Sequence, residues 1–332
     1  MYETHGDAIM SHNYSKILVT GGAGFIGSYL VNKLISDGFA VTLIDDLSSG
    51  SLENIRHHTG NRDFRFIRGD IRNFNVVKRA VKEADAVFHE AGVLSWANSW
   101  EGFLHLNQVN VDGTLTLLRA CVDFSVKRFV YASSAGVYGE TGVQLQHEDL
   151  TPRPISPYGA SKLSGEQYVQ VVHRLYGLET VCLRYFNVYG PRQAYGPYSG
   201  VMTRFINRLS KNKPPIIFGD GEQTRDFVNI KDVMNANMLA LTKKRAVGEV
   251  FNIGTGVATR IEELAKTLQE IMNKTDVKPV HEDPRPRDIR NSCANINKAK
   301  EFLGYDPRVS LKNGLRELVK YFRVSRKLSR SE

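Results

Sequence analysis

Tyr158 and Lys162, four residues apart, are the residues of this chain best suited to acid–base chemistry. Ser156 and Pro157 are residue types that favour the N-cap and the first position of a helix, so the two side chains are expected on one helix face. A free tyrosine has a pKa of about 10 and is a poor base at neutral pH. Because a nearby ammonium and a helix N-terminus both stabilise a phenolate, we expect the pKa of Tyr158 to be lowered.

A tyrosine and a lysine at this spacing are usually an ordinary tyrosine and a solvated lysine, so a catalytic interpretation needs further support. One such feature is the polar segment 133–139, which directly follows a strand expected at 128–132 and contains Ser134. Ligands of open α/β sheets bind at the carboxyl ends of the strands. A serine hydroxyl there can orient a substrate hydroxyl and share its proton.

The second feature is a glycine-rich loop, TGGAGFIG at 20–27, between a strand expected at 16–20 and the start of a helix. Gly21 allows a tight turn, Gly24 lets the backbone approach a pyrophosphate, and Gly27 permits close packing of helix on strand. The helix N-terminus then offers free N–H groups to an anion. A glycine turn without a ligand is the alternative, which the strand–turn–helix context disfavours. The residues expected to contact a dinucleotide here are Gly21, Gly24, Phe25, Ile26 and Gly27.

The second strand, expected at 40–44, is followed by Asp45, about 20 residues after the glycines. A carboxylate there binds a ribose 2′-hydroxyl and repels a 2′-phosphate, which predicts NAD rather than NADP. Asp45 could instead cap the next segment, but no arginine adjoins it to accept a phosphate. After the third strand, Asp70 and Ile71 are expected beside the adenine, although an aspartate can also simply begin a helix.

Strands alternating with helices through the first half of the chain imply right-handed βαβ units and a parallel sheet. After about Phe186 the alternation fades and proline and glycine clusters appear. We therefore predict an α/β protein with a Rossmann doubly wound sheet and a smaller C-terminal α/β domain. The expected divisions are a disordered lead-in (1–13), an NAD-binding domain (14–185), a partly interleaved substrate domain (186–324) and a basic tail (325–332). The further strands are expected at 64–68, 86–89, 128–132 and 181–184.

The composition, 42% hydrophobic and 24% charged over 332 residues, is typical of a globular protein. No apolar run approaches the roughly 18 residues that suggest a membrane span, and the first 13 residues lack a signal-peptide core. Three scattered cysteines favour a reducing cytoplasm and no metal site. The net charge of +9 raises the question of nucleic acid. Because the basic residues are spread out, we expect none and relate the charge to anionic ligands.

Seven motifs together make the chain recognisable over about 16–321, as it resembles the extended short-chain dehydrogenase/reductases. Within them it is most similar to the NAD-dependent UDP-sugar 4-epimerases. This resemblance implies a tightly bound NAD that is regenerated in each turnover, a UDP-sugar substrate and a homodimer formed through helices near 111–123 and 161–176. The motifs are TGGAGFIG (20–27), SSAGVYG (133–139), YGASK (158–162), RYFNVYGPRQ (184–193), GDGEQTRDFVNI (219–230), FNIGTG (251–256) and RPRD (285–288).

The resemblance also implies residue roles. Tyr158 would take the proton of the sugar 4-hydroxyl, Lys162 would hold the nicotinamide ribose, and Ser134 would bind the 4-oxygen. Hydride would pass from C4 to NAD and return to the opposite face after the 4-keto sugar turns. Guanidinium forks suit phosphate oxygens, although a surface ion pair is the default for an arginine. The other implied contacts are Ala91, Gly92 and Asn110 to the cofactor, and Asn187, Arg225, Arg285 and Asp288 to UDP.

Two positions bear on the reaction and the sugar. Related dehydratases and decarboxylases carry a glutamate after the catalytic hydroxyl position, where this chain has Ala135 and Gly136, so simple epimerisation is favoured. The position beside the sugar C2 substituent aligns with Ser292, which leaves room for an N-acetyl group. A shift of one residue would place Asn291 or Cys293 there, and Ser292 would then face solvent. We therefore expect UDP-glucose/UDP-galactose and UDP-GlcNAc/UDP-GalNAc interconversion.

Several alternatives stay open. The nearest is a 4-epimerase of UDP-glucuronate or a UDP-pentose. A non-catalytic NAD-sensing protein ranks lower, because such a protein would be expected to lose Tyr158 or Lys162. Leu94 replaces a lysine found in some glucose/galactose enzymes, and the neighbouring Trp96 and Trp100 are expected to be core anchors rather than walls of the sugar pocket.

Overall fold

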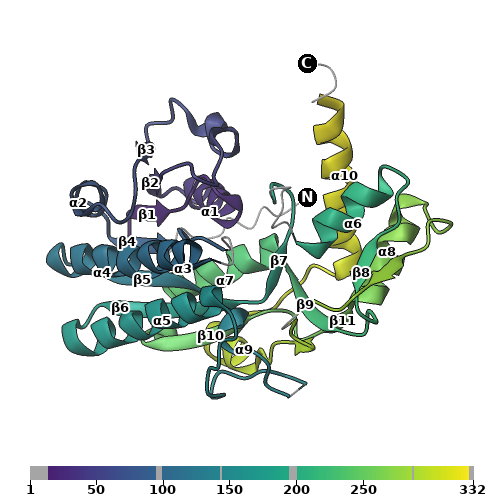
Figure 1. The fold of residues 1–332 in the computed structure, drawn as a ribbon. Helices are drawn as coiled ribbons and strands as arrows, with labels where there is room; N and C mark the ends of the chain where they lie inside the picture. The colour runs from purple at the N-terminus through teal and green to yellow at the C-terminus, as the bar shows by residue number, and fades with distance from the viewer. Residues whose placement is uncertain (1–13, 95–98, 143, 194–199, 286–287, 329–332) are drawn as a thin grey trace, which may run out of the picture.

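The computed structural model describes residues 14–94, 99–142, 144–193, 200–285 and 288–328 (Figure 1). The expected lead-in 1–13 and Trp96 lie outside these residues. The large sheet is entirely parallel, with strand order β10-β6-β5-β4-β1-β2-β3. The order reverses between β1 and β4, which is where ligands of doubly wound sheets bind. The strands are β1 Lys16–Thr20, β2 Ala40–Asp45, β3 Phe64–Arg68, β4 Ala86–His89, β5 Arg128–Ser134, β6 Glu179–Tyr185 and β10 Glu249–Ile253.

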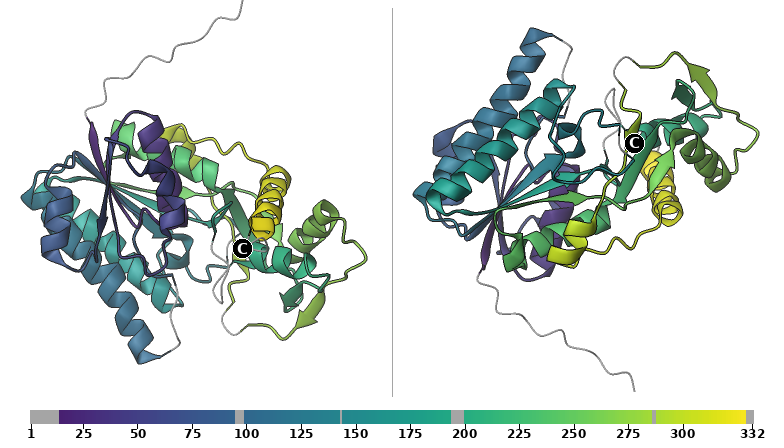
Figure 2. Two further views of the ribbon diagram at one scale, coloured as in Figure 1. Left: turned by 90° about the horizontal axis from the view of Figure 1, so that it is seen from above. Right: turned by 90° about the horizontal axis from the view of Figure 1, so that it is seen from below.

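Helices cover both faces of this sheet (Figure 2). Successive side chains of β1 show why: Ile17 and Val19 join one core cluster, and Leu18 joins another. A strand buried on both faces reads as a continuous apolar run, as this one does. The helices of one layer are α1 Phe25–Ser36, α7 Ile230–Thr242 and α9 Asn297–Leu303; those of the other are α2 Phe74–Val81, α3 Trp100–Asn107, α4 Gly113–Asp123 and α5 Pro157–Tyr176.

A smaller sheet and its own core follow in the second half of the chain, where α6, α8 and α10 pack around apolar residues such as Phe205, Leu264 and Leu318. β10 comes after this small sheet's strands β7 and β9 yet joins the large sheet. The division at residue 185 stays a prediction. The elements are β7 Asn187–Tyr189, β9 Thr224–Asn229, β11 Ala258–Arg260 and β13 Asn291–Ser292, a separate pair β8 Ile216–Phe218 and β12 Val280–Glu282, and helices α6 Val201–Leu209, α8 Ile261–Met272 and α10 Leu311–Leu328.

A buried ion pair fixes α5 against the large sheet. Arg184 of β6 donates to both carboxylate oxygens of Glu166 on α5, at 2.7 and 3.0 Å. Ser133 of β5 donates to the same carboxylate at 2.6 Å, and the side chains of the pair are 4% and 0% exposed. Charges so deeply buried require partners of this kind. The pair therefore holds α5, which carries Tyr158 in its first turn, in one position against β5 and β6.

Some elements differ from expectation. α10 continues to Leu328, into the expected basic tail. Trp100 is 78% exposed at the start of α3, and the centroid of its ring lies 5.8 Å from that of Phe103. The prediction of a core anchor is therefore wrong for this residue. A π-helical turn at Gln108–Asp112 joins α3 to α4. Among the described residues, no helix is long and apolar enough to cross a membrane.

Candidate active site

The glycine loop has the geometry that its sequence predicts. Gly21 has φ of +67° and its N–H donates to the Ile44 carbonyl at 2.9 Å, so the chain turns sharply at the end of β1. Gly27, in the first helical turn of α1, packs directly against the glycine loop. A β-carbon on Gly27 would overlap the carbonyl oxygen of Gly21. Gly24 is the N-cap of α1 and has no side-chain cap. The first N–H groups of Phe25 and Ile26 therefore face the switch point of the sheet.

Asp45, at the end of β2, is buried and ordered by the same loop. Its carboxylate accepts hydrogen bonds from the backbone N–H groups of Ala23 at 3.0 Å and Leu47 at 2.8 Å. Burial raises the pKa of Asp45, and the two backbone hydrogen bonds oppose that rise. Asp45 therefore joins the glycine loop to the strand that would carry the ribose.

The Asp70 carboxylate is already occupied. Arg72 donates to both of its oxygens at 2.5 to 3.0 Å, and this hydrogen bonding lowers the pKa of Asp70. The Ile71 side chain is buried and packs against Gly113, the first residue of α4. The expected contact of Asp70 and Ile71 with adenine stays a prediction. The ion pair and the core packing are interactions that sequence reasoning missed.

The loop after β4 contributes the other expected cofactor residues. The Ala91 N–H donates to the Thr20 hydroxyl at 3.2 Å, and Gly21 packs on the Ala91 backbone. Asn110, in the π-helical turn, holds this loop by bonding both backbone groups of Val93 at 2.8 and 2.9 Å. A β-carbon at Gly92 would lie 3.1 Å from both Asn110 Oδ1 and Lys162 Nζ. The absence of a side chain therefore leaves space at the lysine head, which fits a cofactor in the crevice.

Tyr158 is the second residue of α5 and faces Ser134. The Ser156 side chain caps the helix by accepting from the Gly159 N–H at 3.0 Å, and Pro157 is the first helical residue, as predicted. A hydrogen bond from Ser134 lowers the pKa of Tyr158, but burial raises it more, so the net direction is upward. The expected lowering is therefore wrong for the protein alone. The cause is desolvation, which disfavours the phenolate.

Lys162, one turn further along α5, is almost fully buried. Its ammonium donates to the Ala132 carbonyl of β5 at 2.9 Å and lies 5.2 Å from the Tyr131 ring centroid. Burial lowers the pKa of Lys162 to about 8, because an ammonium is poorly solvated there. Lys162 is thus held by the strand that carries Ser134. Because its pKa is lowered toward neutral pH, a change in nearby charge alters its protonation.

Glu90 is a titratable residue of this site that sequence reasoning missed. It directly follows β4, and Tyr185, at the end of β6, donates to its carboxylate at 2.9 Å. Burial raises the pKa of Glu90 to about 7, although the Tyr185 hydrogen bond and the Lys162 charge both lower it. An acid directly after a buried strand, at the carboxyl edge where the other site residues lie, is the signal that could have identified it.

The small sheet gathers three of the expected substrate residues on one face. Asn187 of β7 pairs with Phe227 of β9. Ser292 of β13 pairs with Arg225, which lies two residues before Phe227 on β9. Because alternate residues of a strand share a face, Asn187, Arg225 and Ser292 lie on the same side of the sheet. Ser292 is buried, so the alternative of a solvent-facing loop residue is wrong. The register thus brings together residues more than a hundred positions apart.

Arg225 and Asp288, both expected at UDP, bind each other. The guanidinium donates to Asp288 at 2.6 Å and to the Ile289 carbonyl at 2.7 Å. Burial lowers the pKa of Arg225, and the charges of Asp288 and Glu140 oppose that fall. Glu140, which follows the segment 133–139, accepts from the Arg290 N–H at 2.7 Å. This contact links the loop after Ser134 to the segment that carries Asp288.

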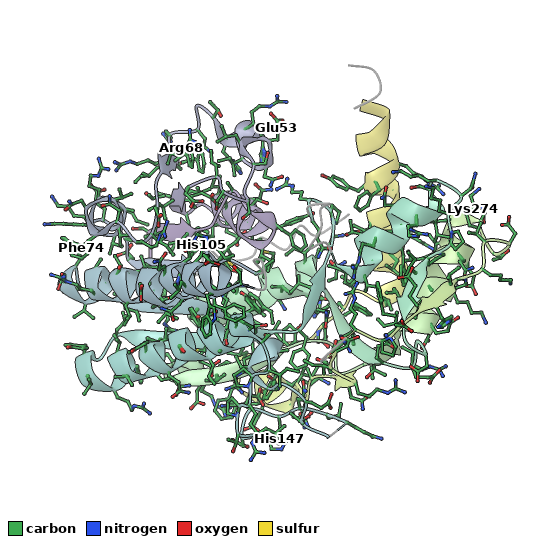
Figure 3. The ribbon with its side chains drawn as sticks, in the orientation of Figure 1. Glu53, Arg68, Phe74, His105, His147 and Lys274 are labelled. Carbon is green, nitrogen blue, oxygen red and sulfur yellow. The ribbon has the colours of Figure 1, made fainter. Side chains whose placement is uncertain are left out.

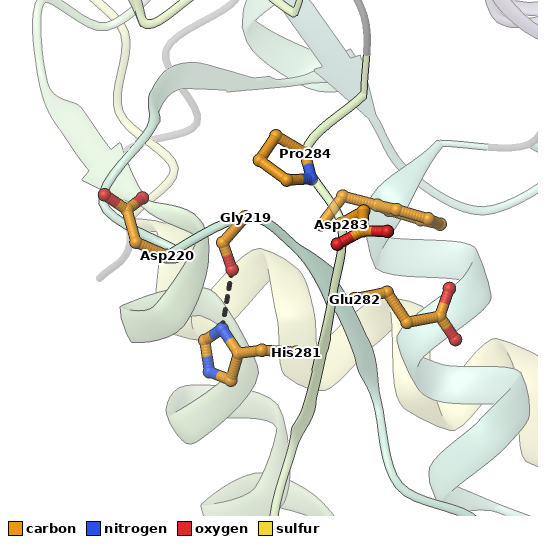
Figure 4. Close-up of a pocket in the computed structure, with 7 residues that line it drawn as sticks. Gly219, Asp220, His281, Glu282, Asp283 and Pro284 are labelled. Atoms are coloured by element: carbon orange, nitrogen blue, oxygen red, sulfur yellow. Dashed lines mark hydrogen bonds between the residues drawn. The ribbon is translucent and has the colours of Figure 1, made fainter.

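Arg285 lies beside an open pocket of about 730 Å³ at the carboxyl ends of β8 and β12. Its guanidinium carbon is 4.0 Å from the ring centroid of Phe218, one of the lining residues. His281 contacts the Gly219 carbonyl through Nδ1 at 2.7 Å (Figure 4). The described residues contain no group of three or more His, Cys, Asp or Glu that could hold a metal ion. The other residues of the lining are Gly219, Asp220, His281, Glu282, Asp283 and Pro284.

Three solved structures resemble this one over almost its whole length. The UDP-glucose 4-epimerase of Thermotoga maritima, solved with UDP-glucose, is 43% identical, with a TM-score of 0.87 over 93% of this chain and 99% of that chain. The UDP-N-acetylglucosamine 4-epimerase of Methanobrevibacter ruminantium is 36% identical (TM-score 0.88; 94% and 99% covered). The UDP-glucuronic acid 4-epimerase of Bacillus cereus, solved with UDP-glucuronic acid and NAD, is 37% identical (TM-score 0.86; 93% and 99% covered).

The family model described as the NAD dependent epimerase/dehydratase family matches residues 17–254, from the first strand of the large sheet to the last. The match includes the glycine loop, Ser134, Tyr158 and Lys162. The resemblance inferred from the motifs is thereby confirmed, as is NAD as the cofactor. This chain belongs to the NAD-dependent epimerase/dehydratase family of extended short-chain dehydrogenase/reductases.

Proposed function

We propose that this protein is a UDP-sugar 4-epimerase that interconverts UDP-glucose with UDP-galactose and UDP-GlcNAc with UDP-GalNAc. The observation that carries the proposal is that Tyr158 and Ser134 both lie against Gly136 at the carboxyl edge of the sheet, with Lys162 one turn away. The residues after Ser134 are Ala135 and Gly136, which offer no further acid or base for an elimination. The site therefore suits a reversible oxidation at one carbon.

The proposed mechanism assigns each side chain one task. NAD, when bound, supplies the acceptor and later the donor of the hydride at sugar C4. Tyr158 accepts the 4-hydroxyl proton and returns it, while Ser134 holds the 4-oxygen. Lys162 stabilises the phenolate through its charge, and a bound nicotinamide cation adds to that effect. Because burial raises the pKa of Tyr158 in the protein alone, the positive charge of bound NAD would be needed to bring the tyrosine into its working range.

The proposed UDP site lies on the small sheet. Arg225 is half-buried with its planar fork held by Asp288 and by backbone carbonyls, which is a geometry suited to phosphate oxygens. Asn187 is exposed on the same face. Arg285 is exposed and held against the Phe218 ring. These observations support a diphosphate between the small sheet and the side chains of Arg285 and Asp288.

The sugar preference rests on Ser292. It is buried in register with Arg225, on the face that also carries Asn187, and its side chain is small. A small residue there supports acceptance of a C2 N-acetyl group. The glucuronate enzyme from Bacillus cereus is about as similar to this chain as the N-acetylglucosamine enzyme, at 37% and 36% identity, so UDP-glucuronate, like a UDP-pentose, is a rival substrate.

The test is incubation of the purified protein, without added NAD, with UDP-glucose, UDP-GlcNAc, UDP-glucuronate and a UDP-pentose in separate reactions. We expect NMR spectra to show the C4 epimer of the first two. Tyr158→Phe should lower turnover at least about 100-fold while retaining NAD, because it removes the acid–base group. The exposed Tyr168 on the same helix provides the control Tyr168→Phe. Failure to convert any substrate with NAD supplied would refute the proposal.

We also propose a homodimer formed through α4 and α5, which pack side by side on one face of the large sheet (Figure 1). The exposed large hydrophobic residues of α5 support it, since Leu175 is 70% and Tyr176 65% exposed. Leu175→Glu should give a monomer in light scattering after size exclusion. Leu52→Glu, at a residue 50% exposed outside these helices, should leave the dimer intact. A wild-type monomer would refute this proposal.

A further inference from the structure

The carboxylate of Glu90 lies among the groups that carry the proposed chemistry, yet the mechanism above assigns it no task. It follows β4, so it emerges at the same sheet edge as Ser134 of β5 and the glycine loop of β1. Tyr185, paired in register with Ser134, donates to its carboxylate at 2.9 Å. The backbone of Glu90 is fixed as well, because its N–H donates to the Thr20 carbonyl at 3.2 Å. Glu90 is thus held through both its side chain and its backbone.

The groups around Glu90 come from three elements. Tyr185 of β6 in turn accepts a hydrogen bond from the Asn237 side-chain amide of α7 at 2.8 Å. From α5, Lys162 and Tyr158 are the titratable groups whose charges act on the carboxylate or respond to it. The adjacent His89 faces away, since its ring nitrogens contact Thr20 and Thr114. His89 and Tyr131 pair in register on β4 and β5, so the residues that follow them are Glu90 and Ala132, and the Ala132 carbonyl accepts from Lys162. Two residues beyond Glu90, a β-carbon on Gly92 would lie 3.1 Å from Lys162 Nζ. Lys162 is therefore the cation beside Glu90.

Lys162 has no other carboxylate to balance it. Its direct hydrogen bond is to the neutral Ala132 carbonyl, and among the described residues Glu90 is the one charged group found to act on it. A buried ammonium without a counter-charge tends to lose its proton. We propose that Glu90 is a positioning residue of the redox site, whose negative charge keeps the Lys162 ammonium protonated and so sets the pH range in which Tyr158 and Lys162 work together.

The direction of the effect follows from the charges. The Glu90 carboxylate raises the pKa of Lys162 and also raises the pKa of Tyr158. Removing that charge lowers both values. The acidic limb of the pH profile, which requires loss of the tyrosine proton, and the basic limb, which requires the lysine proton, then move the same way. Because interacting groups titrate as a pair, the whole profile moves to lower pH whichever group dominates a limb.

The experiment compares the pH dependence of kcat for the NAD-loaded wild type and Glu90→Gln. We expect both limbs of the Gln variant to shift to lower pH by about one unit or more, the low end of the effect of a nearby charge. Glu90→Asp, which keeps the charge, should have a pH profile closer to that of the wild type. A Gln variant with lower kcat but an unchanged profile would show that Glu90 has only a structural role, and would overturn the inference.

A second variant covers the case in which Glu90→Gln does not fold. Tyr185→Phe removes the hydrogen bond that favours the ionised carboxylate, so Glu90 stays neutral to a higher pH, and we expect the acidic limb to shift in the same direction by less. Tyr138→Phe, which also removes a buried tyrosine hydroxyl but one that contacts Arg184 and Asn252, should leave the limbs unmoved. Equal profiles for both tyrosine variants would contradict the inference.

This inference rests on the proposed function, and the two can fail separately. An inactive wild type refutes the epimerase proposal. An active wild type whose profile Glu90→Gln leaves unmoved refutes only the role of Glu90.

Discussion

Gly27→Ala tests how the glycine loop couples the fold to the cofactor. The new β-carbon would overlap the Gly21 carbonyl oxygen and lie 2.7 Å from Gly22 Cα, closer than real β-carbons approach other atoms. These are backbone atoms, so the turn itself must move. Overpacking of this kind costs about 1–3 kcal/mol, while alanine in a helix gains about 1 kcal/mol over glycine. We therefore expect the free energy of unfolding to fall by at most about 2 kcal/mol.

Cofactor affinity should respond more strongly, because NAD needs the turn where it is. If restoring the turn on binding costs about 1–3 kcal/mol, the dissociation constant rises roughly 5- to 150-fold. Calorimetric titration of NAD into stripped protein measures this directly. Gly38→Ala, at the other end of α1, is the control: with φ of +88° and no atom within 4 Å, it adds backbone strain without overlap. Wild-type NAD affinity in Gly27→Ala would refute this account of the loop.

Three further predictions concern stability and substrate binding. Glu166→Gln leaves the Arg184 guanidinium buried without a counter-charge and should destabilise the protein by about 3–5 kcal/mol in urea unfolding. Glu317 forms an exposed ion pair with Lys231, so the control Glu317→Gln should change the free energy of unfolding by less than about 1 kcal/mol. Asp85, which directly precedes the central strand β4, is desolvated, but backbone, hydroxyl and lysine donors outweigh this and lower its pKa to about 2. The stability it contributes is present above the unfolded pKa of about 3.9 and lost as pH falls from about 5 to 2, so Asp85→Asn should flatten the melting temperature over that range; an unchanged slope would contradict this. Arg225→Lys loses the planar fork and should raise KM for UDP-sugar about tenfold with little change in kcat, whereas an equal fall in kcat would place Arg225 in the chemical step.

Local signals explain what could be predicted from the sequence. β1, β3 and β4 begin and end at the predicted residues, because short apolar runs bounded by turn residues leave little choice. The start of α5 was equally well defined, since a serine cap followed by proline fixes the helix at Pro157 and places Tyr158 in its first turn. The tight turn at Gly21 follows from the glycine that permits its positive φ.

Interactions across the sheet could not be predicted in the same way. The absence of an arginine beside Asp45 was judged along the chain, yet Arg68 of β3 is its cross-strand partner (Figure 3). Trp100 was expected in the core because of its size, but α3 presents it to solvent. Each of these depends on register or on helix orientation, which a single sequence does not contain.

The protonation of the redox pair shows why the same limit applies to chemistry. The spacing of Tyr158 and Lys162 correctly places them one turn apart, and from that alone a lowered tyrosine pKa follows. Burial reverses this result, because desolvation of the phenolate exceeds the stabilisation that Ser134 provides. Burial also lowers the pKa of Lys162, and the charge that opposes this fall comes from Glu90, about 70 residues away at the end of β4. The two catalytic side chains are therefore a local feature of α5, whereas the pH at which they can work is a property of three neighbouring strand ends, β4, β5 and β6. A variant that moves Glu90 should alter that pH without altering which residues perform the reaction.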